Sequence, residues 1–236
     1  MAKTYLDLVN QVLKRVREPT VGSVGANLYS VLISTFINDA KRVVEDSWEW
    51  SCLWKQVDFD ISASVLEYDL GDTALVGAGN ELTERALLLY RPGDSCPLAW
   101  DVTTPNPSPL TEVYRHKVAS DLALQTYNST YQMPMYFSVT PTNDSIGVHL
   151  IETPSETRSW RMVFKQPQDE LEDGTDEILV PWYPVVLLAT NYALNERGEE
   201  IGQPGNEAEK KYMQALSDAI ALDSRYSYDD LVFIPS

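Results

Sequence analysis

The stretch VEDSWEWSCLWKQVDFDI, residues 44–61, decides the fold because the spacing of apolar residues changes within it. Before it, apolar residues recur every three or four positions, as on one face of a helix. After it, from Val57 to Ile61, they alternate with acidic residues, as in a strand with one buried face. Three tryptophans lie at this change: Trp48, Trp50 and Trp54. We expect them to fill a structural joint between a helix and a sheet.

Two helices are predicted before the tryptophans. Residues 4–18 form one apolar stripe that begins with capping-box spacing at Thr4 and Asp7 and ends before Pro19. Asn27 caps a second helix of about twenty residues. Its apolar stripe consists of Ile33, Phe36, Ile37, Ala40, Val44 and Trp48. Four charged residues are expected to face away from that stripe: Lys41, Arg42, Glu45 and Asp46.

The middle of the chain alternates apolar and polar residues, which predicts a mostly antiparallel sheet or sandwich. The expected strands are 57–61, 66–70, 84–91, 96–102, 135–140, 146–151 and 158–166. A short helix at 111–126, capped by Thr111, is expected to interrupt them.

The last part of the chain returns to helical spacing. Residues 168–177, QDELEDGTDE, are expected to be a solvated loop. Pro181 and Pro184 start a helix at 182–197, and Gly198 stops it. A last helix follows at about 206–223. The apolar residues 226–236 then form a C-terminal arm.

These patterns predict an α+β fold in which the terminal helices form a four-helix bundle, because each apolar stripe needs others to cover it. The bundle domain is residues 1–53 and 177–236, and residues 54–176 are an inserted β-domain. The formal net charge of −17 lies entirely outside residues 1–53, which are neutral overall. Such acidity argues against a surface that grips nucleic-acid phosphates.

No catalytic motif is recognisable in the sequence, so we expect no enzyme, no metal and no cofactor. The two histidines, His116 and His149, are most simply ordinary surface or half-buried residues. Residues 169–180 fit a calcium-binding loop poorly, because Leu171 and Val180 stand where oxygen ligands belong. Two widely spaced cysteines suggest neither a disulfide framework nor a zinc site, and no segment is long and apolar enough to cross a bilayer.

The two ends of the chain resemble the head-to-tail adaptor family of short-tailed phages, the tail tubular protein A-like proteins. Four segments carry the resemblance: YLDLVNQVLKRVREP at 5–19, VLISTFINDAKRVVEDSWEWSCL at 31–53, LVPWYPVVLLATNYALNERGEE at 179–200 and AEKKYMQALSDAIALDSRY at 208–226. The β-region is similar only in position and size. Loops 71–83 and 103–110 are read as additions to the family's smallest form.

The resemblance implies a structural virion protein without catalytic site or cofactor. About a dozen copies form a closed ring between the portal and the tail nozzle. The helical part meets the portal and neighbouring subunits, the β-part faces the nozzle, and genomic DNA passes through without specific binding. The expected location is the virion tail or neck, with host cytoplasm during assembly and no membrane.

The C-terminal arm is the expected partner-binding segment, for the portal or the neighbouring subunit. Its apolar and aromatic residues are Tyr226, Tyr228, Leu231, Val232, Phe233 and Ile234. The arm could instead fold back on its own bundle.

Two other functions fit parts of the pattern. A carbohydrate-binding or glycan-hydrolysing tail-associated protein would turn tryptophans outward and bring two carboxylates together in a pocket. A capsid decoration or stopper protein would be structural but placed elsewhere.

Overall fold

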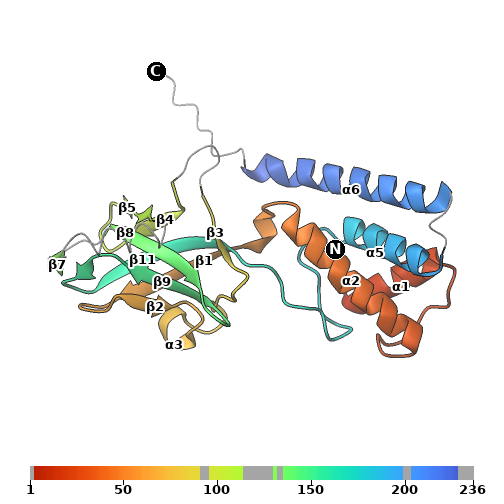
Figure 1. Cartoon of the computed structure of the whole chain (residues 1–236), viewed down its shortest axis with the longest axis horizontal. Helices are drawn as coiled ribbons and strands as arrows, with labels where there is room; N and C mark the ends of the chain where they lie inside the picture. The colour runs from red at the N-terminus through yellow and green to blue at the C-terminus, as the bar shows by residue number, and fades with distance from the viewer. Residues whose placement is uncertain (1–2, 91–95, 114–129, 132–134, 199–202, 228–236) are drawn as a thin grey trace, which may run out of the picture. The chain divides into compact units, whose positions relative to one another are not determined.

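The computed structural model describes residues 3–90, 96–113, 130–131, 135–198 and 203–227 of the 236-residue chain (Figure 1). The fold is α+β. The chain divides into two compact units, a helical unit of residues 1–53 and 167–236 and a β unit of residues 54–166. The β unit is therefore an insertion between two segments that fold together.

Four long helices make up most of the helical unit: α1 (Tyr5–Arg15), α2 (Leu28–Asp46), α5 (Trp182–Glu196) and α6 (Gln203–Ser227). Helix α5 contacts the other three, and α1 also contacts α2 (Figure 1). All four contribute buried side chains to one hydrophobic core, which includes Leu8, Ile37, Val44, Val186, Ala189 and Tyr212. The ends of the chain thus fold around a common interior, as the apolar stripes predicted.

Local sequence sets the ends of these helices. Thr4 and Asp7 form a reciprocal capping box on α1, and Asn27 and Ser30 form another on α2, so orphan N–H groups at both helix starts are satisfied. Gly198, with φ of 74°, follows α5 and allows the left-handed turn that ends it. Helix α1 ends at Arg15, earlier than expected, because the chain turns through Arg17 at φ 62°.

The exposure predicted for Lys41 and Glu45 is wrong. Both side chains are buried, with exposed fractions of 2% and 0%. The Lys41 ammonium lies 3.2 Å from Glu45 Oε1 and donates to the carbonyls of Gln168 and Asp169 at 2.7 and 2.8 Å. Residues following the β unit therefore cover this face of α2, and two of their carbonyls accept from its buried ammonium.

Residues 167–176 belong to the helical unit, so the domain boundary differs from the predicted one. The helical unit resumes at Pro167, earlier than the expected 177. Asn38 exchanges two 3.1 Å hydrogen bonds with the backbone of Leu171, which is buried among the helices, and Tyr5 N donates to Asp176 O at 2.7 Å. The carboxylates of residues 168–177 lie mostly exposed, as expected, but the backbone between them is anchored to α1 and α2.

The corrected boundary changes the distribution of charge. The helical unit holds 10 basic and 21 acidic residues, a net charge of −11, and the β unit holds 8 and 14, a net charge of −6. The acidity therefore belongs mainly to the helical unit rather than to the sheets. Residues 168–177 account for six acidic groups and no basic one.

Two larger sheets and a strand pair form the β unit. One sheet has the order β1 (Trp54–Ile61), β11 (Arg158–Lys165), β4 (Ala99–Asp101), β5 (Ser108–Pro109), and β3 (Leu87–Leu88) also pairs with β11. The other has the order β2 (Glu67–Asp69), β9 (Ile146–Leu150), β8 (Tyr136–Pro141), β6 (Thr111–Glu112). The strand pair is β7 (Thr130–Tyr131) with β10 (Thr153–Pro154).

Side chains from both sheets share one core. Phe59 from β1, Trp160 from β11 and Phe137 from β8 meet there, with ring centroids of Phe59 and Phe137 at 6.2 and 5.9 Å from Trp160. In β1 the buried residues alternate along the strand, as the sequence predicted. Most pairings are antiparallel, while β6 with β8 and β7 with β10 are parallel.

The helix predicted at 111–126 is wrong at its start. Thr111 and Glu112 form strand β6 beside β8 instead of capping a helix, and residues 114–126 lie outside the described residues. The strands expected at 84–91 and 96–102 shorten to β3 and β4. Loop 71–83 contains a short helix, α3 (Thr73–Val76), capped by Asp72, and loop 103–110 contains β5. Among the described helices, none has both the length and the apolar composition that a bilayer crossing requires.

Candidate interaction surfaces

The tryptophan turn, residues 47–53, follows α2 and ends in the short 3-10 helix η1 (Ser51–Leu53). Trp50 is completely buried in the helical core, and its indole N–H donates to Val44 O at 2.6 Å. Trp48 is partly buried and packs on the same core. For these two residues the structure agrees with a packing role.

Trp54 differs from the other two tryptophans of this stretch. It is the first residue of β1, belongs to the β unit and is 41% exposed. The expected burial of all three rings is therefore wrong for Trp54. The idea that it forms part of a joint between a helix and a sheet stays a prediction.

The Asp223 carboxylate connects α6 to the tryptophan turn. It accepts three hydrogen bonds, from Trp48 Nε1 at 3.1 Å, Ser51 N at 3.2 Å and Ser51 Oγ at 2.6 Å. Ionised acceptors form stronger hydrogen bonds than neutral ones. This contact therefore fixes the last turns of α6 against the C-terminal end of α2.

We expect Asp223→Ala to loosen the end of α6, since Ser51 and Trp48 lose an ionised acceptor. The expected loss is about 1–3 kcal/mol of stability. Hydrogen exchange should accelerate in the last turns of α6 and less in α1. Asp218→Ala is the matched control on the same helix, because Asp218 is exposed and accepts from Gln214 one turn away. Equal effects of the two changes would contradict the assigned role of Asp223.

The loop between α1 and α2 encloses an open hollow of about 740 Å³, which we call the tip groove. It is lined by Leu13, Glu18, Pro19, Thr20, Val21, Asn27, Leu28 and Tyr29. Leu28 is 90% exposed although it is a large apolar residue.

Arg197, at the end of α5, braces one side of the tip groove. Its guanidinium donates to Tyr29 Oη at 2.9 Å, to Val16 O at 3.0 Å and to Glu18 Oε1 at 2.6 Å. It also lies over the Tyr29 ring, 4.9 Å from its centroid. Arg197 therefore ties the end of α5 to two residues that line the groove, Glu18 and Tyr29.

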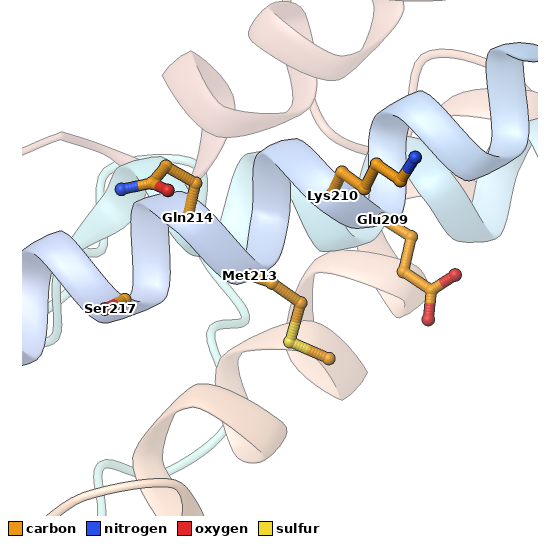
Figure 2. Close-up of a pocket in the computed structure, with 5 residues that line it drawn as sticks. All are labelled: Glu209, Lys210, Met213, Gln214 and Ser217. Atoms are coloured by element: carbon orange, nitrogen blue, oxygen red, sulfur yellow. The ribbon is translucent and has the colours of Figure 1, made fainter.

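The outer side of α6 is a second exposed surface, shown in Figure 2. Its shallow hollow is lined only by α6 residues: Glu209, Lys210, Met213, Gln214 and Ser217. Met213 is 55% exposed and Leu222 is 58% exposed, whereas Tyr212 and Ala215 turn into the core. One helix lining a hollow by itself makes a flat face, which suits a broad protein contact better than a small ligand.

Arginines of strand β11 form ion pairs on both faces of the five-stranded sheet. Arg161 donates to both carboxylate oxygens of Asp58 at 2.8 Å across paired strands β11 and β1. The hydrogen bond from Arg161 holds the pKa of Asp58 below its usual range. On the inward side of the same strand, which also carries Trp160, Arg158 donates to the buried Asp101 Oδ2 at 3.1 Å. These carboxylates are thus partners of arginine and not free acids for chemistry.

The Asp58–Arg161 pair predicts a small pH dependence. Because the folded pKa of Asp58 is depressed, its stabilisation is present above the ordinary Asp pKa of about 4 and is lost as the pH falls through the lowered value. Both side chains are about half exposed, so Arg161→Met should cost under about 1 kcal/mol at neutral pH. Unfolding free energies of the two proteins should converge in acid. A difference that grows in acid would contradict the pair's role.

One of the two histidines lies beside a carboxylate. His149 Nδ1 lies 3.3 Å from Glu67 Oε1, but Glu67 is 82% exposed and the two residues are neighbours across β9 and β2. No group of three or more His, Cys, Asp or Glu side chains within the described ranges is placed to hold a metal ion. His116 lies outside the described residues.

The C-terminal arm is only partly described. The backbone of Tyr226 and Ser227 continues α6, so the arm begins later than the expected residue 226. The other predicted contact residues lie outside the described residues: Tyr228, Leu231, Val232, Phe233 and Ile234. Sequence reasoning missed the tip groove, although an exposed leucine at the start of a capped helix was visible in Asn27-Leu28.

Comparison of the sequence with protein-family models and with curated proteins gives no match.

Proposed function

We propose that this protein is a structural head-to-tail adaptor of a short-tailed phage, which forms a ring between the portal and the tail nozzle. The observation that carries the proposal is the common core of the two chain ends, with the β unit inserted between them. This is the arrangement that the family resemblance implied, and it suits a building block with two contact regions. In this proposal the helical unit is a four-helix bundle and the β unit a sandwich.

The surfaces of the helical unit support an assembly role. The tip groove and the outer face of α6 both expose large apolar side chains, Leu28 and Met213 among them. Exposed apolar surface commonly marks contacts between proteins. Two different surfaces on one subunit allow heterologous contacts, which close a ring when the rotation between subunits is right.

The charge supports a passage for DNA rather than a binding site for it. Each chain carries a net charge of −17, and both units are acidic. Affinity for DNA depends on Lys and Arg neutralising phosphates. A ring of about a dozen such chains would repel the genome from its wall and so let it pass without specific contacts. The proposed location is the virion tail or neck, after assembly in the host cytoplasm, with no enzymatic activity.

The carbohydrate alternative receives less support from the tryptophans. Trp50 and Trp160 are completely buried and Trp48 is tied to Asp223, so these rings serve packing. Trp54, at 41% exposed, is more accessible than these three tryptophans. Titration with glycans tests the alternative, because a sugar stacked on Trp54 would change the tryptophan fluorescence and Trp54→Phe would abolish that change.

Imaging with the cognate portal tests the proposal. The protein should add a ring of density to one end of negatively stained portal particles. Portal particles that stay bare at every protein concentration would contradict an adaptor role. A glycan-dependent fluorescence change without portal binding would favour the alternative.

A further inference from the structure

We infer that the tip groove binds residues 228–236 of a second copy of this chain. The segment YDDLVFIPS follows α6 directly and places two acidic residues before four consecutive apolar ones. Its role as a ring contact rests on the proposed function, whereas the binding itself does not. The contact would make one subunit's α6 end the partner of the next subunit's tip groove.

In the described part of the chain, the groove has an apolar lining that is partly exposed. Leu13, Val21 and Tyr29 line it, and Leu28 stands at its edge with 90% of its surface exposed. Asn27 caps α2 with its side chain, so an apolar residue at position 28 is not needed to begin the helix. Burying Leu28 under an apolar partner would recover about 1.5–3 kcal/mol of transfer free energy.

The acidic start of the segment need not enter the groove. Three basic residues, Lys14, Arg15 and Arg17, lie near the end of α1, but none of them lines the groove. Arg15 donates to Gln11 and lies over the Tyr183 ring. The charged residue that lines the groove, Glu18, accepts from Arg197 at 2.6 Å. Leu231 and Phe233 would enter the groove, while Asp229 and Asp230 stay outside it.

Distance within the helical unit excludes the chain's own segment as the occupant. Asp223 is bonded to Trp48 and Ser51, beyond the C-terminal end of α2, whereas the groove lies at its N-terminal end. The 19 residues of α2 span about 28 Å. Figure 1 shows α6 running away from the α1–α2 loop toward its own last turn.

The reach of the segment is shorter than that span. From Ser227, a fully extended chain reaches Leu231 within about 14 Å and Ile234 within about 25 Å. The apolar residues therefore fall short of the groove in their own subunit. A groove filled by this segment must take it from another copy, and a contact between unlike surfaces then propagates from subunit to subunit.

A labelled peptide of residues 227–236 tests the binding directly by fluorescence anisotropy with the full-length protein. We expect saturable binding that Leu28→Asp weakens at least about tenfold, because the variant places a charge against the apolar segment. Val43→Asp is the matched control, since Val43 is a 43% exposed apolar residue elsewhere on α2 and should leave binding unchanged. Phe233→Ala in the peptide should weaken binding to the unmodified protein.

Mixing two full-length variants tests whether the contact joins two copies. L28D keeps the segment but loses the groove, and the double variant L231D/F233D keeps the groove but loses the segment. Above the dissociation constant measured for the peptide, each alone should stay monomeric and the mixture should give a two-chain species. Absence of peptide binding, equal binding by L28D and V43D, or a mixture that stays monomeric would overturn the inference. Peptide binding with portal particles that remain bare would instead overturn only the adaptor function.

Discussion

Trp50→Ala is expected to lower the free energy of unfolding of the helical unit by about 3–5 kcal/mol, among the largest effects of any single change in this chain. The indole has no exposed surface and fills the core where α2 ends. Truncation would leave a cavity and would leave Val44 O without the indole donor that now lies 2.6 Å away. Urea unfolding followed by the helical circular dichroism signal measures the loss.

Trp54→Ala is the matched control, because it removes the same side chain four residues later. Trp54 is 41% exposed in the β unit, so the helical transition should shift by less than about 1 kcal/mol. If the two variants destabilised the helical unit equally, the separation of Trp50 and Trp54 into different units would be wrong.

Lys41→Met is expected to cost about 3–5 kcal/mol, because it leaves the Glu45 carboxylate buried without its cation. The ammonium also holds the carbonyls of Gln168 and Asp169, which connect the returning chain to α2. Arg42→Met is the control, since Arg42 is exposed on the same turn and should change stability by less than about 0.5 kcal/mol. The measurement is again urea unfolding.

The double variant Lys41→Met with Glu45→Met distinguishes the loss of a buried ion pair from a change in side-chain packing. Removing both charges should cost less than Lys41→Met alone, since no unpaired charge then remains in the core. If the stability losses of the two single variants, Lys41→Met and Glu45→Met, summed to the loss of the double variant, the two residues would act independently. That result would contradict a direct ion pair between Lys41 and Glu45.

Helix ends were predictable because their determinants are local. Thr4 with Asp7 specifies the start of α1, Asn27 specifies the start of α2, and Gly198 specifies the end of α5. Each of these devices acts within four residues, so sequence spacing alone reveals it. The shared core of the helices followed from apolar stripes that need cover.

Burial that depends on distant residues was not predictable in the same way. Lys41 and Glu45 look like an exposed pair one turn apart, and only the return of residues 167–169 covers them. Thr111 resembles a helix cap until β8 supplies a strand partner. Trp54 is an instructive exception, because the alternation of Val57, Phe59 and Ile61 already places position 54 on the outward face of β1.

Candidate interaction residues were harder to predict than elements. The apolar composition of residues 226–236 predicts a contact segment but does not indicate the surface that it contacts. The tip groove depends on a hollow between loop 18–27 and two helix ends, a feature of tertiary structure. The exposed Leu28 side chain connects the arm with the tip groove, because an apolar segment that binds in the groove would cover it.

Native mass measurement of the protein mixed with the cognate portal tests the central claim most directly. We expect a portal complex heavier by about a dozen chains of 26.6 kDa, with few partly filled intermediates. A protein that remains a 26.6 kDa species at every portal ratio would contradict it.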